Sequence, residues 1–151
     1  MTDTSPVLEC SIDQGVARLW LARPERRNAL DETLMAELTS KIAELDGRSE
    51  VRVIVIGGRG KAFCAGADLN WMARASQYDR AQNLEDVARL SRLLQTLDQV
   101  SKPTIARIHG ACYAGATGLA AACDIAIASD DARFCFSEVR LGLVQIGRAH
   151  V

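Results

Sequence analysis

The sequence predicts an α/β fold, because strand-like and helix-like segments alternate along the chain. The strand-like segments are short apolar or β-branched runs bounded by turn residues, and the helix-like segments repeat apolar residues at helical period. At 151 residues, with 48% hydrophobic and 25% charged content, the chain is long enough for one domain with its own core. No linker or low-complexity tract divides it.

The first group of elements is a β-hairpin followed by a helix. Residues 7–12 and 16–21 are apolar-rich and flank the turn Asp13-Gln14-Gly15. A polar loop covers residues 23–28. Asp31 is placed to cap a helix that Gly47 ends. The apolar residues of this helix recur at helical period and are Leu34, Leu38, Ile42 and Leu45.

The second group begins with a strand over residues 51–56, and residues 57–60 are predicted to turn away from its end. A short segment at 62–64 enters a loop, after which Asp68 is placed to cap a brief helix over 69–72. A long helix is expected over 80–99. Its predicted apolar stripe consists of Leu84, Val87, Leu90, Leu94 and Leu97.

The third group opens after Lys102-Pro103 with a strand over residues 104–108. Residues 110–118 are small and are expected to be flexible, and 119–123 continue in helical style. Strands are predicted over 124–128 and 133–136. The element order is therefore ββα, a second ββα-like group and then βαββ.

Bulk composition excludes several function classes. The net charge is −1 and no basic run stands out, so nucleic acid is not an expected partner. The apolar runs are much shorter than the roughly 20 residues that a membrane helix needs. Residues 1–6 are polar and lack the order of a signal peptide. We therefore expect a cytoplasmic protein without a membrane partner.

The cysteines and histidines give no sign of a disulfide framework or a metal site. Five cysteines are scattered without a C-x-x-C pair, an odd count that favours reduced and mostly buried thiols. Nothing in the sequence activates them as nucleophiles. The two histidines, His109 and His150, are isolated from other metal-ligand residues. We expect no metal.

The glycine-rich run at residues 57–61 does not fit a nucleotide-binding loop. A phosphate-binding loop requires Gly at position 55 and Ser or Thr at position 62, where the chain has Val55 and Ala62. A dinucleotide fingerprint starting at Gly58 fails because position 63 is Phe. A tight turn is the simpler interpretation.

Two small-residue segments, 65–68 and 114–118, are each predicted to lie at the start of a helix. N–H groups there lack intrahelical acceptors, and small side chains let a ligand approach them closely. Two such N–H groups that converge on one point would form an oxyanion hole. For each segment alone, ordinary packing at a helix start is the favoured explanation, because contacts between helices and strands also favour Gly and Ala.

Five motifs in the same order resemble those of the crotonase (enoyl-CoA hydratase/isomerase) superfamily, and together they cover the chain to Val144. Residues 23–30 resemble its R-P-x-x-x-N-A-L stretch, and residues 61–69 its F-x-A-G-x-D-L loop. Residues 102–110 resemble the K-P-x-I-A strand and the glycine after it. Residues 123–128 and 136–142 complete the series.

The resemblance implies a crotonase-like spiral of ββα repeats, incomplete at the C-terminus. It implies that the two oxyanion-hole N–H groups belong to Ala67 and Gly115. It also places a set of residues near coenzyme A: Arg26, Ala29, Ala65 and Asp68, with Gly118 facing the substrate. Coenzyme A is then part of the substrate, and no separate cofactor is implied.

Hydratases of this family carry two glutamates beside the reacting double bond. By the same resemblance the second is Glu138, which would be the general base and acid. The first falls on Gly118, where no carboxylate exists. A surface or ion-paired glutamate is the alternative for Glu138, and Arg26 and Arg27 either bind phosphates of coenzyme A or are simply solvated.

The motif details most resemble bacterial methylglutaconyl-CoA hydratases of leucine catabolism, namely Gly118-Leu119, residues 70–72 and residues 137–142. This implies an enoyl-CoA hydratase (a hydro-lyase), and a homotrimer or hexamer for the intact parent. An isomerase, a thioesterase or another enolate-forming enzyme is an alternative, since the oxyanion hole serves all of them. A non-catalytic acyl-CoA binding subunit is another.

The end of the sequence departs from the family pattern. We expect residues 1–144 to be the N-terminal part of a crotonase-like domain, and residues 145–151 to be a non-native tail. His150 is accordingly given no catalytic role. We expect the activity to belong to an intact parent, and a fragment of this kind to leave apolar surface uncovered.

Overall fold

The structure is a computed structural model, and it describes residues 6–138 and 142. Its strands are β1 (Leu8–Asp13), β2 (Val16–Leu21), β3 (Val53–Gly58), β4 (Ala62–Cys64), β5 (Thr104–Ile108), β6 (Ala111–Tyr113), β7 (Ile125–Ala128) and β8 (Arg133–Cys135). Its helices are the short 3₁₀ helix η1 (Pro24–Arg26), then α1 (Glu32–Asp46), α2 (Leu69–Ala75), α3 (Arg80–Gln99) and α4 (Gly115–Ala122).

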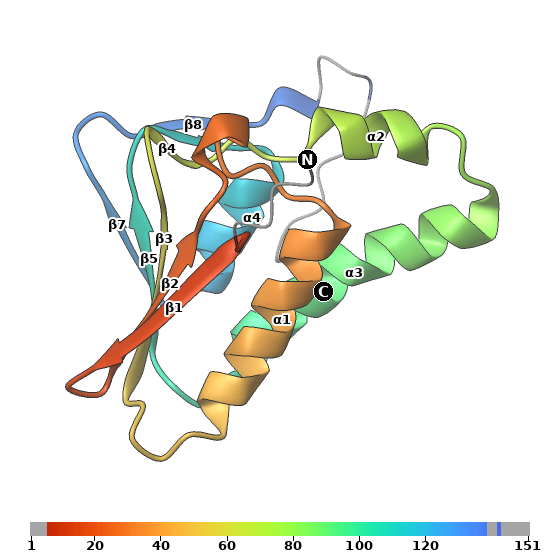
Figure 1. Cartoon of the computed structure of the whole chain (residues 1–151). Coiled ribbons are helices and arrows are strands. Elements are labelled where there is room, and N and C mark those ends of the chain that lie inside the picture. The colour runs from red at the N-terminus through yellow and green to blue at the C-terminus, as the bar shows by residue number, and fades with distance from the viewer. Residues whose placement is uncertain (1–5, 139–141, 143–151) are drawn as a thin grey trace.

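The strands form two sheets, a five-stranded sheet in the order β1-β2-β3-β5-β7 and a three-stranded sheet in the order β4-β6-β8 (Figure 1). Only the β1–β2 hairpin is antiparallel. After the hairpin, each successive pair of strands adds its first strand to the larger sheet and its second to the smaller one. This is the predicted ββα spiral, and the α/β fold class is confirmed.

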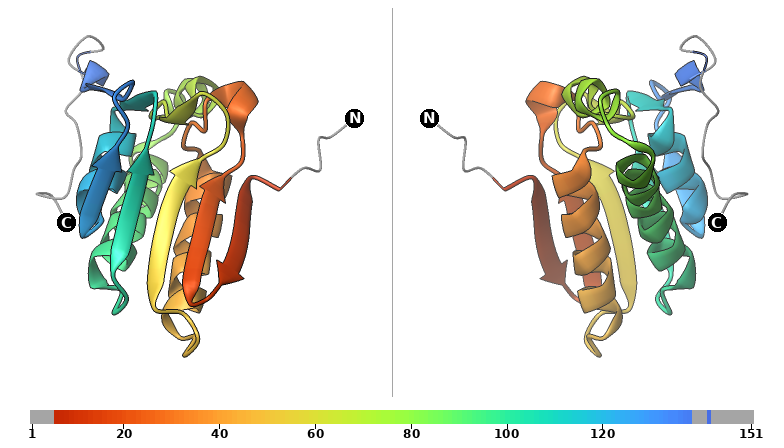
Figure 2. Two further views of the ribbon diagram at one scale, coloured as in Figure 1. Left: turned by 90° about the vertical axis from the view of Figure 1, so that its left-hand side faces the viewer. Right: turned by 90° about the vertical axis from the view of Figure 1, so that its right-hand side faces the viewer.

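Helices α1 and α3 cover one face of the larger sheet (Figure 2). Strand residues alternate between faces, so Leu19, Ile54 and Ala106 point toward these helices and are fully buried. From α1, the predicted stripe of Leu34, Leu38, Ile42 and Leu45 meets them and is also fully buried. The alternation in the strands and the helical repeat in α1 both direct apolar side chains into the layer between sheet and helices. These side chains therefore form one continuous core.

The cap of α1 is confirmed, but its end differs from the prediction in conformation. The Asp31 side chain accepts a hydrogen bond from the Leu34 N–H at 2.9 Å, as an N-cap residue does. Gly47 follows the last helical residue with φ of −75°, so the helix ends there without the left-handed turn that usually favours glycine.

Residues 57–60 were predicted to turn away from the end of the third strand, but Gly57 and Gly58 belong to the strand and the turn begins only after them. Strand β3 runs over Val53–Gly58, two residues later than expected, and pairs Gly57 with Trp20. A Cβ on Gly57 would lie 2.5 Å from a ring carbon of Trp20. The glycine is therefore required by the indole that covers it, which Arg59 and Arg107 flank with guanidinium carbons 4.6 and 5.4 Å from the ring centre.

Two further expectations are corrected. Residues 110–118 are not simply flexible, because they form β6 and the start of α4. The long helix matches its predicted bounds, yet Leu84 and Val87 of its stripe are exposed and only its second half is buried in the core. Strand β7 is exposed along its whole length at the edge of the larger sheet. No helix in the described part of the chain is long and apolar enough to cross a membrane.

Candidate active site

A cavity of about 600 Å³ lies where the loops before α1 and α2 meet. The residues that line it are Glu25, Arg26, Arg27, Ala29, Ala65, Ala67, Asp68, Leu69, Asn70 and Tyr113. This set includes every residue predicted to lie near coenzyme A except Gly118. Of the predicted catalytic residues it includes Ala67. Segments more than thirty residues apart in sequence therefore converge here, as the motifs implied.

The loop before α1 is held by Asn28, which is fully buried with a left-handed φ of 56°. Its side-chain N–H₂ donates to the carbonyls of Arg59 at 2.9 Å and Ala62 at 2.8 Å. Its side-chain oxygen accepts from the Arg23 N–H at 2.9 Å. One amide thus ties the loop to the β3–β4 connection and fixes the wall of the cavity that carries Arg26 and Ala29.

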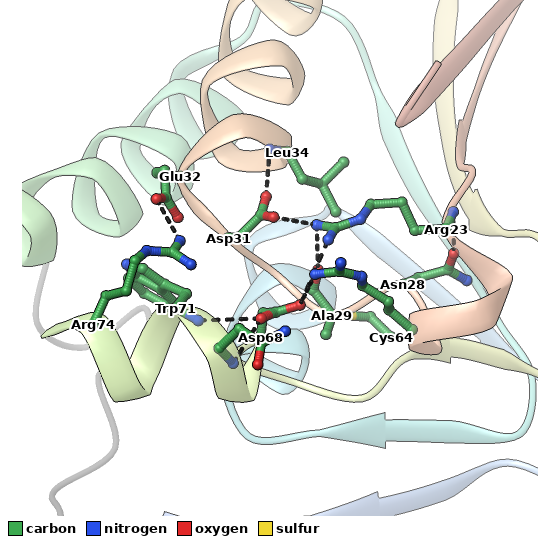
Figure 3. A network of polar contacts seen from close by, with 12 residues as sticks. Arg23, Asn28, Ala29, Asp31, Glu32, Leu34, Cys64, Asp68, Trp71 and Arg74 are labelled. Atoms are coloured by element: carbon green, nitrogen blue, oxygen red, sulfur yellow. Dashed lines mark hydrogen bonds and ion pairs between the residues drawn. The ribbon is translucent and has the colours of Figure 1, made fainter. Parts of the chain in front are cut away.

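Beneath the loop, Arg23 connects two carboxylates (Figure 3). Its guanidinium lies 2.5 Å from Asp31 and 3.5 Å from Asp68, and all three side chains are largely buried. Arg26 adds a second contact to Asp68 at 3.2 Å while remaining half exposed. Arg26 is therefore both part of this cluster and accessible from the cavity.

Asp68 organises the start of α2. Its second carboxylate oxygen accepts the N–H groups of Asn70 at 2.9 Å and Trp71 at 3.1 Å, so the predicted N-cap is confirmed. Burial by itself raises the pKa of this carboxyl. The hydrogen bonds from the Trp71 N–H, the Arg26 side chain and the Asn70 N–H outweigh burial, and the pKa lies below its usual value.

The backbone N–H of Ala67 points away from Leu30. The Leu30 N–H donates to the carbonyl of Gly66 at 2.7 Å, and the Leu30 carbonyl accepts from the N–H of Asp68 at 2.8 Å. These two hydrogen bonds form a parallel β-bridge between Leu30 and Ala67. In such a bridge the opposite residue directs its own N–H and C=O to the other side. That N–H has no acceptor among the described residues. Its direction thus comes from strand pairing and not, as predicted, from a helix start.

The segment that begins α4 lies against Gly66, the residue before Ala67. A Cβ on Gly66 would lie 2.8 Å from the Cβ of Ala114, so the two chains touch one residue before Ala67 and Gly115. Gly115 is the first residue of α4, where an N–H has no intrahelical acceptor. Within residues 6–138 this N–H also has no other acceptor. Two unpaired N–H groups therefore flank one contact point.

The turn into α4 is held in place by the smaller sheet. Ala114 has a positive φ of 54°, uncommon for alanine, and its N–H donates to the carbonyl of Cys135 at 2.8 Å. Glu138 lies three residues further along the chain. One of its carboxylate oxygens is buried without a hydrogen-bond partner in the part of the chain that the structure describes. A buried oxygen of this kind can accept a proton or bind a water.

Gly118 lies inside α4 and is buried. Gly115, Gly118 and Glu138 are not among the residues that line the cavity described above, so the structure does not bring them to the same cavity as Ala67. The predicted tail at 145–151, with His150, lies outside the described residues.

The cysteines take no visible part in this chemistry. Burial raises the pKa of Cys64 and Cys123 to about 12 and that of Cys112 to about 11, so these thiols stay protonated. Cys10, expected in the core, is instead exposed. No group of three metal-ligand side chains occurs among the residues whose placement the structure gives.

The sequence interpretation assigned no role to Arg23 or Asn28. Both belong to the first motif, but a buried arginine in a polar loop leaves no periodic signal. The one indication in the sequence that these two residues have a structural role was their position shortly before the capping residue Asp31.

Known proteins resemble this chain over most of its length. The family model described as enoyl-CoA hydratase/isomerase matches residues 11–150. A peroxisomal Delta(3,5)-Delta(2,4)-dienoyl-CoA isomerase of Arabidopsis thaliana is 36% identical over 150 residues, covering 93% of this chain and 54% of the isomerase. An enoyl-CoA hydratase of Alternaria alternata is 39% identical over 129 residues, covering 85% and 41%.

Solved structures resemble it equally closely. An enoyl-CoA hydratase of Shewanella pealeana superposes with a TM-score of 0.90 at 41% identity, over 92% of this chain and 52% of the hydratase. One from Mycobacterium smegmatis gives a TM-score of 0.87 at 37% identity, over 92% and 54%. The chain spans about half the length of the curated relatives it matches.

Proposed function

Because the chain belongs to the enoyl-CoA hydratase/isomerase family, we propose that the intact protein adds water across the Cα=Cβ bond of an enoyl-CoA. The observation that carries this proposal is the pair of unpaired N–H groups, on Ala67 and Gly115, on either side of the Gly66–Ala114 contact. The cavity beside Ala67, with Arg26 and Arg27 at its edge, would hold the coenzyme A part of the substrate.

The two N–H groups would bind the thioester oxygen. As water attacks Cβ, electrons move from the double bond onto this oxygen and an enolate forms. Fixed donors stabilise the enolate more than the neutral carbonyl, which lowers the barrier. Loss of one such donor typically costs about 3–4 kcal/mol of transition-state stabilisation.

Glu138 would carry out both proton transfers. Its buried, unpartnered oxygen accepts one proton from the attacking water, and the C–O bond forms at Cβ. The same carboxyl then returns the proton to Cα, and the enolate electrons close the new C–H bond. A single carboxylate is used because Gly118 offers none at the position of the first family glutamate.

For the substrate we propose methylglutaconyl-CoA, a step of leucine catabolism. Support comes from the resemblance of Gly118-Leu119, residues 70–72 and residues 137–142 to bacterial hydratases of that compound. We further propose that the intact protein is cytoplasmic and a homotrimer or hexamer, as the same resemblance implies.

The test is hydration by the intact protein, followed by loss of the enoyl-thioester absorbance. Glu138→Gln should lower kcat by at least about 100-fold and leave thioester binding within about twofold, since only proton transfer is removed. Glu37→Gln, an exposed glutamate of α1, is the matched control and should behave as wild type. Unchanged turnover in Glu138→Gln would remove that residue from the mechanism.

Isomerisation is the second candidate, favoured by two observations. Gly118 removes a carboxylate that a two-glutamate hydration uses, and a dienoyl-CoA isomerase is among the similar proteins. The product separates the two reactions, because hydration adds the mass of one water to the acyl group and isomerisation adds none.

A further inference from the structure

Two buried polar atoms lie where α1 meets α2, and neither has a hydrogen-bond partner among the described residues. They are Nε1 of Trp71 and one carboxylate oxygen of Glu32. An unpaired buried N–H costs about 1–3 kcal/mol, so a buried indole N–H in a folded protein normally has an acceptor. The indole N–H of Trp71 is therefore a donor for which the described residues supply no acceptor.

The position of Trp71 is fixed relative to the oxyanion donors. Asp68 follows Ala67 directly and donates its own N–H to the Leu30 carbonyl at 2.8 Å. Its carboxylate accepts the backbone N–H of Trp71 at 3.1 Å (Figure 3). The same aspartate thus orients the backbone of Ala67 and the start of the helix that carries the indole. Movement of one without the other would break these bonds.

Helix α2 separates two sides of the site. Leu69 and Asn70 line the cavity, whereas Trp71 does not line it and is partly buried against the core. Figure 3 shows the side chains of Trp71 and Arg74 leaving α2 toward Glu32 at the start of α1.

Apolar groups border Gly115 on the core side. A Cβ on Gly115 would have its nearest neighbours in Leu30, at 3.6 Å, and Leu90, at 4.0 Å. Leu90, like Trp71, is partly buried against the core. A thioester with coenzyme A in the cavity and its oxygen between Ala67 and Gly115 would extend its acyl group onto this side.

We propose that Trp71 is a specificity-determining residue whose indole N–H donates to an oxygen atom on the acyl group. The site then selects acyl chains with a carboxylate or hydroxyl beyond the reacting carbons over plain hydrocarbon chains. Glu32 affects whether a hydroxyl or a carboxylate is preferred. Arg74 pairs with one carboxylate oxygen of Glu32 at 2.6 Å, and the other oxygen has no partner among the described residues. A hydroxyl could therefore accept from the Trp71 indole and donate to Glu32, whereas a carboxylate could only accept from the indole. This inference rests on the proposed function for the position of the thioester.

The experiment follows the indole N–H resonance of Trp71 by NMR while the 151-residue chain is titrated with three saturated thioesters of equal chain length. These are glutaryl-CoA, 5-hydroxypentanoyl-CoA and pentanoyl-CoA. Trp20→Phe removes the one other tryptophan, which lies on the far face of the sheet, and so assigns the signal. We expect a downfield shift with one or both oxygen-bearing thioesters and none with pentanoyl-CoA, and the thioester that shifts it identifies the group bound.

Affinity gives the second measurement. Trp71→Phe keeps an aromatic ring but removes the donor, so it should weaken the oxygen-bearing thioesters about tenfold and change pentanoyl-CoA by less than about twofold. Trp20→Phe is the matched control and should change neither. If Trp71→Phe does not fold, the indole shift in the unsubstituted chain decides alone.

Two failures are distinguishable. Binding of all three thioesters with equal affinity and an unmoved indole signal would refute the role of Trp71 and leave the proposed function standing. If the 151-residue chain binds none of the three, this inference fails, and the hydration assay of the intact protein decides the proposed function separately.

Discussion

Asp68 shows how one side chain can serve several parts of the site. It accepts two backbone N–H groups at the start of α2, pairs with Arg23 and Arg26, and adjoins the backbone of Ala67. Resemblance placed it near coenzyme A, and it does line the cavity. The contacts indicate that its charge mainly orders the loop, so its effect on binding would be indirect.

Asp68→Asn is therefore expected to destabilise the fold more than it changes chemistry. Asparagine can still cap α2, but the buried Arg23 loses one of its two carboxylates. We expect the free energy of unfolding to fall by about 3 kcal/mol, measured by urea denaturation. Asp13→Asn is the control, because its contact with Arg18 spans 3.9 Å at the surface and should be worth little.

The same substitution predicts a pH dependence with a definite sign. The folded pKa of Asp68 lies below the ordinary value of 3.8, so its carboxylate stabilises the fold at pH values above 3.8. That contribution is lost as the pH falls through the folded pKa. The difference in unfolding free energy between wild type and Asp68→Asn should be constant near neutrality and shrink below about pH 4. A difference that instead grows in acid would contradict this assignment.

At the scale of elements, the spacing of apolar residues predicted most helices and strands. It failed where contacts between elements determine the local structure. The bounds of α3 and β5 agree with the prediction because long periodic runs and a strand after Lys102-Pro103 are local signals. Strand β6 was missed, since a strand of three residues is too short to show a period. Gly57 was assigned to a turn because nothing local reveals the indole of Trp20 above it.

Gly57→Ala tests this explanation. Its Cβ would lie 2.5 Å from the Trp20 ring, which must shift and give up its position between Arg59 and Arg107. We expect a loss of about 1–3 kcal/mol in unfolding free energy, measured by thermal or urea denaturation. Gly47→Ala is the matched control, because the nearest atom to its Cβ is 3.7 Å away and its φ is ordinary. Equal effects of the two substitutions would rule out crowding as the reason for Gly57.

For the whole molecule, the spiral brings the loops after β2, β4 and β6 to one end, where the candidate site lies (Figure 1). Sequence motifs predicted this convergence for Arg26, Ala29, Ala65 and Ala67 through family resemblance. Composition and period alone could not, because they do not report which loops meet. The roles of Arg23 and Asn28 were out of reach for the same reason, since both depend on partners distant in sequence.

The larger sheet ends in an uncharged edge. Strand β7 exposes half or more of Ile125 and Ile127, whereas β1 at the opposite edge carries Glu9 and Asp13. Exposed apolar edge strands promote association between chains. Ile127→Lys should therefore reduce self-association of the 151-residue chain in sedimentation velocity, and Ser40→Lys, which adds the same charge on α1, should not. Equal association of the two variants would argue against this edge as the contact.

The central claim is that the N–H groups of Ala67 and Gly115 bind one thioester oxygen. Backbone NMR of the 151-residue chain, titrated with acetoacetyl-CoA whose thioester carbonyl carries ¹³C, tests it most directly. We predict that the amide protons of both residues move downfield together, with the same midpoint as the carbonyl carbon. A bound thioester whose carbonyl shifts while either amide stays in place would contradict the claim.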